Sequence, residues 1–134
     1  MIKLNIIPLE KVNDVKFGAK RDEVREKFKE YGSPTEFTKS KQFSKNTTDD
    51  YGVFHIFYNE KNEFEAIEIF ENTEVYVDGK LIFPGNVDEI LKMFPDSEKD
   101  HEYYTSVAKS VGITTEEETG KVEAILFGCC GYYE

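Results

Sequence analysis

Histidine and cysteine, side chains often used in nucleophilic, acid–base and metal chemistry, occur only twice each in this chain. The two histidines stand in different surroundings, His55 in an apolar segment and His101 in an acidic run. Cys129 and Cys130 are adjacent, and no basic neighbour in the sequence lowers the pKa of either thiol. Catalysis needs a nucleophile with its base, a metal-ligand set or a pair of tuned carboxylates. The sequence displays no such pattern and predicts a protein that is not an enzyme, with no cofactor and no metal site.

The cysteines and the N-terminal segment bear on the compartment. A disulfide between adjacent cysteines closes a strained ring, so Cys129 and Cys130 make no secreted disulfide framework, and we expect reduced, dispensable thiols. Residues 1–8 alternate apolar and polar side chains, unlike a signal peptide. No segment approaches the roughly 20 apolar residues of a membrane span. These features predict a cytoplasmic protein.

Carboxylates dominate the surface chemistry. The 134 residues include 27 acidic and 17 basic side chains, which gives a net charge of −10. This charge repels phosphate backbones and anionic lipid headgroups, so nucleic acid and membranes are poor direct partners, whereas a basic protein is attracted. An acidic surface also serves simply to keep a cytosolic protein soluble, and both interpretations stay open. The candidate partner-binding residues form two acidic runs, Asp96, Glu98, Asp100 and Glu102 in the first and Glu116, Glu117 and Glu118 in the second.

Two short amphipathic helices are expected, over residues 20–31 and 86–94. Each has an apolar stripe for a core and a charged face for solvent, and we expect Arg21 and Arg25 to be largely solvated. Asn86 is a good N-cap for the second helix, with a glutamate three residues on as in a capping box. The stripes are Val24, Phe28 and Tyr31 in the first helix and Val87, Ile90, Leu91 and Phe94 in the second.

Segments rich in β-branched and aromatic residues predict the strands. Between two of them, Asp78-Gly79 suits a type I′ hairpin turn. The polar stretch 35–50 is interpreted as a mobile loop. Together these elements predict one α+β domain over residues 1–134, with an antiparallel sheet and two helices packed on one face. The expected strands are 2–7, 15–17, 52–58, 64–70, 75–77, 80–83, 110–117 and 121–127.

Two of the expected strands carry apolar residues on both sides, residues 64–70 in one and residues 53–58, apart from His55, in the other. A sheet covered by helices on one face should alternate more cleanly. Either the long loop and the chain termini cover the second face, or that face offers its aromatic side chains to a partner.

The two helical segments align at an offset of 66 residues. Four positions are identical between 17–28 and 83–94. Further matches follow on the strands, Gly52-Val53 with Gly112-Ile113 and Glu65-Ala-Ile67 with Glu123-Ala-Ile125. Matches in the same order predict an internal duplication of a helix-then-hairpin unit, with pseudo-repeats at about 15–83 and 83–134.

A resemblance to known families lies in the string Gly18, Asp22-Glu23, Val24, Phe28 and Gly32-Ser-Pro34, followed by a strand pair. The string resembles the helix-then-sheet unit of small outer-membrane assembly lipoproteins and of the β-lactamase inhibitor proteins, which use that unit twice. It is also similar to many small acidic immunity proteins encoded beside bacterial polymorphic or contact-dependent toxins.

This similarity covers about residues 15–70 and, less closely, 83–127. Lys20 stands where such families often carry serine or threonine, and the lipidated cysteine of the lipoproteins is absent. The resemblance implies an antiparallel sheet with helices on one face and a binding role, and it transfers no site residue.

We therefore expect an immunity or inhibitor protein that binds and neutralises a cognate bacterial toxin domain, a basic nuclease, by occlusion. It is expected to be a monomer outside that complex. The alternative is a small non-enzymatic adaptor or ligand-binding module with another partner. A toxin gene immediately upstream would favour the first function, and a preformed apolar pocket would favour the second.

Overall fold

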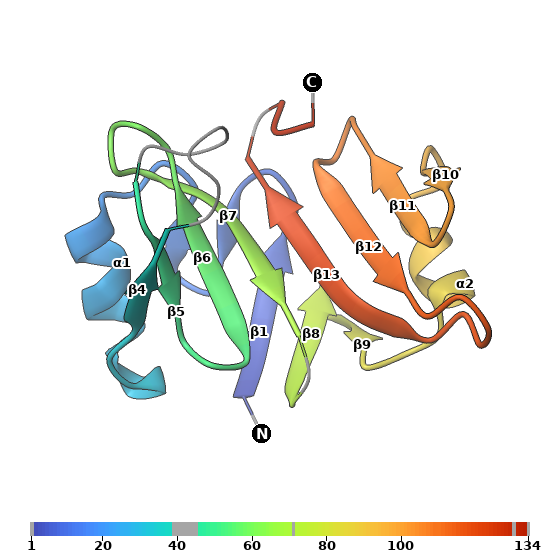
Figure 1. Ribbon diagram of the computed structural model, residues 1–134, viewed down its shortest axis with the longest axis horizontal. Coiled ribbons are helices and arrows are strands. Elements are labelled where there is room, and N and C mark those ends of the chain that lie inside the picture. The colour runs from blue at the N-terminus through green and yellow to red at the C-terminus, as the bar shows by residue number, and fades with distance from the viewer. Residues whose placement is uncertain (1, 39–45, 71, 130, 134) are drawn as a thin grey trace.

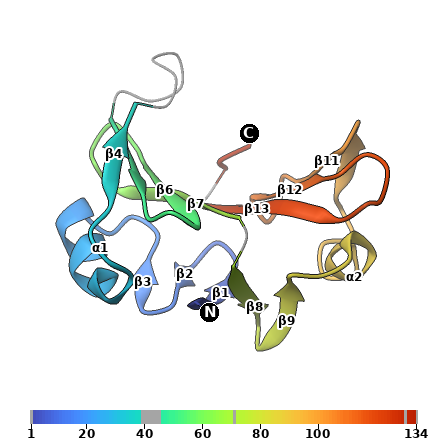
Figure 2. The same cartoon turned by 60° about the horizontal axis from the view of Figure 1, so that its bottom comes forward.

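The computed structural model describes residues 2–38, 46–70, 72–129 and 131–133. Its strands form two sheets, one of eight strands and one of five. Figure 1 looks onto the eight-stranded sheet, and Figure 2 shows the five-stranded sheet as a separate layer beside it. The main hydrophobic core contains residues from both sheets, so the two layers pack on each other.

All neighbouring strands of the eight-stranded sheet are antiparallel. The order is β10-β11-β12-β13-β7-β6-β5-β4, so the two central strands come from different halves of the chain. The strands are β4 (Thr35–Phe37), β5 (Thr48–Asp50), β6 (Phe54–Tyr58), β7 (Phe64–Ile69), β10 (Glu98–Asp100), β11 (Tyr103–Ser106), β12 (Val111–Thr115) and β13 (Val122–Gly128).

The five-stranded sheet corrects the prediction of one antiparallel sheet. Its order is β3-β2-β1-β8-β9, and β1 runs parallel to β8 while its other pairs are antiparallel. Hydrophobic patterning shows that a segment is a strand but not which strand lies beside it. The turn at Asp78-Gly79 has φ values of 50° and 85°, as type I′ requires. The strands are β1 (Ile2–Ile7), β2 (Lys11–Val12), β3 (Val15–Lys16), β8 (Thr73–Val77) and β9 (Lys80–Phe83).

The helices are shorter than predicted. The first is α1 (Arg21–Lys27), followed by the 3₁₀ turn η1 (Lys29–Tyr31), and the second is α2 (Val87–Leu91). Asn86 is the N-cap of α2, where its side-chain oxygen accepts from the amide of Asp88 at 2.8 Å. Figure 2 places the helices at opposite ends of the layer that holds the five-stranded sheet. None of the helices in the described part of the chain is long and apolar enough to cross a membrane.

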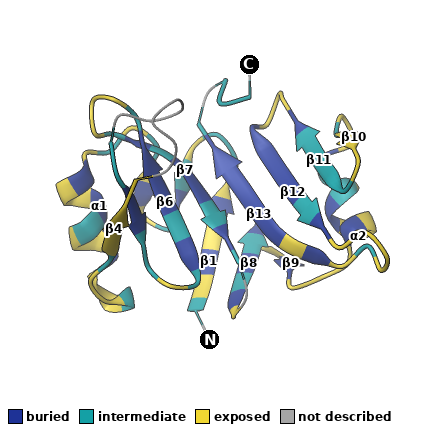
Figure 3. Cartoon of the chain, in the orientation of Figure 1, coloured by how far each residue is buried: buried dark blue, intermediate teal, exposed yellow. Residues whose placement is uncertain are grey.

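The predicted apolar stripes of both helices enter the core. Val24, Phe28, Ile90 and Phe94 are at most 2% exposed and belong to one buried cluster. Figure 3 shows buried residues concentrated on the central strands of the eight-stranded sheet. The α+β class with a mainly antiparallel sheet is therefore confirmed, and the packing of both helices on one face stays a prediction.

The polar stretch 35–50, interpreted from the sequence as a loop, carries two short strands, β4 and β5. Residues 39–45 lie outside the described residues, so the prediction of a mobile loop is not addressed there. Asp49 of β5 is completely buried. The stretch therefore contributes to the sheet and to the interior.

The two halves of the chain share one element order. A hairpin (β2–β3 or β8–β9) precedes a helix, and four antiparallel strands follow it. At the centre of the large sheet, Ile69 pairs with Ile125 and Ile67 pairs with Phe127. An offset of 58 residues relates Ile67 to Ile125 and Ile69 to Phe127, so each pair is the counterpart of the other. This arrangement supports the predicted duplication, which remains a proposal.

Local irregularities also recur at matching places. The register shifts between Phe57 and Tyr58 in β6 and between Thr114 and Thr115 in β12. Isolated bridges join Lys20 to Glu63 and Asn86 to Lys121, at the start of each helix. The register also corrects one match in the sequence alignment. Ile56 pairs with Ile67 of β7, and Ile113 pairs with Ile125 of β13. The counterpart of Ile113 is therefore Ile56 and not Val53.

Candidate functional site

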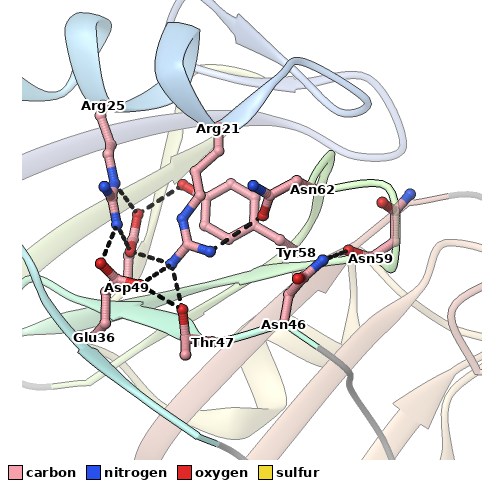
Figure 4. A network of polar contacts seen from close by, with 9 residues as sticks. All are labelled: Arg21, Arg25, Glu36, Asn46, Thr47, Asp49, Tyr58, Asn59 and Asn62. Carbon is pink, nitrogen blue, oxygen red and sulfur yellow. Dashed lines mark hydrogen bonds and ion pairs between the residues drawn. The ribbon is translucent and has the colours of Figure 1, made fainter.

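Two arginines of α1 point onto the sheet rather than into solvent. Arg21 is 9% exposed, so the prediction that it is largely solvated is wrong, and the side chain of Arg25 is 34% exposed. Figure 4 shows both guanidinium groups converging on Asp49 of β5. No signal in the sequence marks Asp49, which follows a polar stretch.

Asp49 is the centre of a polar network. Its carboxylate accepts from the Arg21 guanidinium at 2.6 Å, from Arg25 at 2.6 and 2.9 Å, and from the Tyr58 hydroxyl at 2.9 Å. Arg21 also lies over the Tyr58 ring, 4.4 Å from its centroid, and donates to Asn62 at 3.1 Å. These contacts fasten α1 to β5 and β6.

Electrostatics in the network favour the charged carboxylate. Burial alone would raise the pKa of Asp49, but hydrogen bonds from Arg25, Arg21 and Tyr58 outweigh it and hold that pKa below its usual value. Burial and the neighbouring Asp49 charge raise the pKa of Tyr58. Glu36 on β4 balances the second arginine, at 3.3 Å from Arg25 and 3.5 Å from Arg21. The charged groups pair with one another, so we assign this network to stability, although the buried Arg21 Nε has no hydrogen-bond partner among the described residues.

An open cavity of about 410 Å³ lies at the opposite end of the large sheet. The turn between β10 and β11 forms one wall and the turn between β12 and β13 forms the other. Three carboxylates, one lysine and one tyrosine ring are among its lining residues. The lining comprises Lys99, His101, Glu102, Tyr104, Thr115, Glu116, Glu117 and Gly120.

This cavity joins the two acidic runs that the sequence singled out. Glu102 comes from the first run, and Glu116 and Glu117 come from the second. The other candidates do not line it. Asp96 instead accepts a hydrogen bond from the Ser106 hydroxyl, at 2.9 and 3.0 Å to its two oxygens. The remaining three candidates are exposed and lie outside the cavity lining; they are Glu98, Asp100 and Glu118.

In the described part of the chain, His55 and Cys129 lie apart from both the cavity and the arginine network. His55 lies between Phe37 and Phe70, with ring centroids 5.0 and 4.8 Å away, and its Nε2 is 3.4 Å from Asp50. Cys129 is half-buried, and Cys130 lies outside the described residues. Among the described residues, no three His, Cys, Asp or Glu side chains are grouped so that they could hold a metal ion together.

The C-terminal segment covers the middle of the outer face of the large sheet. Tyr132 and Tyr133 pack on a small apolar cluster of Phe57, Ala66 and Leu126. The Tyr133 hydroxyl lies 2.6 Å from that of Tyr103. Of the two alternatives for the second sheet face, cover by a chain terminus therefore holds at this place.

Gly112 makes room for that cover, and its replacement tests it. A Cβ atom at Gly112 would collide with the hydroxyls of Tyr103 and Tyr133. We expect Gly112→Ala to lower the free energy of unfolding by about 1–3 kcal/mol, the usual cost of overpacking. Urea unfolding measures this cost, and part of it should vanish in the Tyr133→Ala background, where one of the two collisions is relieved. An equal cost in both backgrounds would contradict this role.

Comparison of the chain with family models, curated proteins and solved structures gives no match.

Proposed function

We propose that this chain is a cytoplasmic immunity or inhibitor protein that binds a cognate bacterial toxin domain and neutralises it by occlusion. The observation that carries the proposal is the acid-lined cavity between the two hairpin turns. It gathers Glu102, Glu116 and Glu117 on a molecule whose net charge is already −10. A basic protein surface is the complement of such a region.

The proposed partner is a basic nuclease domain. A nuclease that binds a polyanion carries a cationic surface, and an acidic inhibitor competes for that same surface. In this proposal the chain acts without catalysis or cofactor, as a monomer that forms a one-to-one complex. Its two helix-and-strand units, with the helices on the same face, supply a rigid support for the acidic turns.

Co-expression with a toxin tests this function. The chain should protect bacteria from the product of a toxin gene that adjoins its own, and it should co-purify with the toxin domain in equal amounts. The triple variant Glu102→Lys, Glu116→Lys, Glu117→Lys should protect less at the same cellular level. Full killing in the presence of folded wild-type chain would contradict the proposal.

One observation favours the alternative of a ligand-binding module. A second open cavity of about 780 Å³ lies where the two halves of the chain meet, within the size range of small-molecule sites. It is lined in part by apolar residues, including Val53, Phe70, Phe83, Pro84 and Val122. This alternative would be favoured by a small molecule that stabilises the wild-type chain against unfolding but does not stabilise the Phe70→Ala variant.

A further inference from the structure

The acidic cavity and the arginine network occupy equivalent places in the two halves of the chain. In the first half Asp49 pairs with Ile56 of β6, and in the second Tyr104 pairs with Ile113 of β12. Working outward from these pairs, the residues that contact Arg21 have counterparts that line the cavity, and so do two asparagines, Asn46 and Asn59, that bond to each other beside them. The counterparts are Glu36 with Lys99, Asn46 with His101, Thr47 with Glu102, Asp49 with Tyr104, Tyr58 with Thr115, Asn59 with Glu116 and Asn62 with Gly120.

The arginines themselves have no counterpart. The matching bridges at Lys20 and Asn86 place Val87 where the first half has Arg21. Val87 is 7% exposed, and its Cγ1 would lie 3.9 Å from a Cβ built on Gly120. Valine is shorter than arginine and carries no charge, so Val87 brings no cation to the cavity. The cavity is the place that a guanidinium occupies in the other half of the molecule.

The cavity also offers carboxylates to a cation, but at other positions than the occupied site, because the counterparts of Asp49 and Glu36 are Tyr104 and Lys99. In the first half Arg21 also donates a hydrogen bond to the neutral hydroxyl of Thr47, at 2.9 Å. The counterpart of Thr47 is the carboxylate Glu102, and the counterpart of Asn59 is Glu116. Carboxylates accept the strongest hydrogen bonds from a guanidinium, whose planar fork presents five donors.

An aromatic ring is also available in the cavity. Arg21 lies over the ring of Tyr58 in the first half, and Tyr104 supplies a ring in the second. The Lys99 ammonium already lies 5.6 Å from the Tyr104 centroid, so this ring attracts a cation in the structure itself. Lys99 is exposed and can turn toward solvent when a better-fitting cation enters.

We propose that this cavity receives the guanidinium group of an arginine side chain from the partner protein, in the place where the first half of the chain holds its own Arg21. The identity of the donor as a protein rests on the proposed function, whereas the chemistry of the cavity does not. Because the carboxylates line two separate turns, they suit an extended planar cation more than a compact one.

Titration with N-acetyl-arginine amide, followed by NMR of the isotope-labelled full chain, tests this inference. We expect saturable shifts at the amides of Glu102, Glu116 and Gly120, with weak affinity. N-acetyl-citrulline amide has nearly the same shape without the charge, and it should bind roughly tenfold more weakly or not at all. Equal shifts with both compounds, or shifts elsewhere, would overturn the inference.

Variants sharpen the assignment. Glu102→Gln with Glu116→Gln should weaken binding roughly tenfold, whereas Glu98→Gln with Glu118→Gln removes as much charge outside the cavity and should change it little. Lys99→Glu restores the acid that Glu36 supplies in the first half and should tighten binding about threefold or more. Equal effects of the two double variants would overturn the inference.

A final variant places the ligand within the chain. Val87→Arg carries a guanidinium into the cavity and should abolish binding of the arginine probe while the fold is kept. If that variant is unfolded, the glutamine variants decide. Probe binding without protection from a toxin would reject the proposed function and keep this inference, and protection without probe binding would do the reverse.

Discussion

Replacing Asp49 with asparagine is expected to lower the free energy of unfolding by about 3–5 kcal/mol, because it removes the buried anion that lies between two arginines. The Asp49 side chain has no solvent exposure, and that of Arg21 has 10%. We expect the lower part of this range, since Arg25 is partly exposed and can turn toward water. Chemical denaturation followed by circular dichroism gives the value.

A matched control lies in the same network. Glu36 contacts both arginines, but half of its side chain is exposed. Glu36→Gln should therefore cost less than about 1 kcal/mol, as is usual for exposed ion pairs. Similar losses for Asp49→Asn and Glu36→Gln would show that burial of the carboxylate is not what makes it important.

The effect of Asp49 should also depend on pH. Its pKa in the folded chain is below the usual value because the arginine and tyrosine hydrogen bonds outweigh burial. The stabilisation is fully present above the unfolded pKa of about 4 and is lost as pH falls through the lower folded pKa. The difference in the free energy of unfolding between wild type and Asp49→Asn should be constant above about pH 5 and shrink in stronger acid. A difference that grows in acid would contradict this sign.

The sequence anticipated the elements whose residues carry a local signal. The apolar stripe with Phe28 and Phe94 marked two helices that do enter the core. Asp78-Gly79 marked a turn whose positive φ angles only a few residue types adopt readily. Such features depend on neighbours in the chain, so periodicity and turn chemistry report them directly.

Features that depend on contacts between distant segments were missed. The parallel pairing of β1 with β8 joins residues about 70 positions apart and leaves no mark in either strand. Arg21 was expected in solvent because an arginine on a short helix usually is, yet Asp49, 28 residues away, draws it inside. The cavity was half anticipated, since both acidic runs were noted but their meeting at Glu102 and Glu116 depends on the strand order.

Association with the partner is the second large expected effect. Long-range attraction between the acidic turns and a cationic domain should speed encounter, and raising salt from about 50 to 500 mM should slow association by about tenfold or more as the Debye length shortens. Dissociation should change less, because short-range contacts such as the proposed arginine in the cavity resist screening. Stopped-flow mixing with the toxin domain at several salt concentrations measures both rates.

Charge reversal locates the attraction on the molecule. Glu116, Glu117 and Glu118 lie at the turn between β12 and β13, and all three are exposed. Their replacement by lysine should slow association about tenfold at low salt, because it puts repulsive charge where the partner docks. Replacing Glu23, Glu26 and Glu30 alters the net charge equally at the opposite end of the large sheet, where Figure 1 places α1, and should slow association less. Equal slowing by the two triple variants would mean that net charge alone attracts the partner, and salt-independent association would remove acid steering altogether.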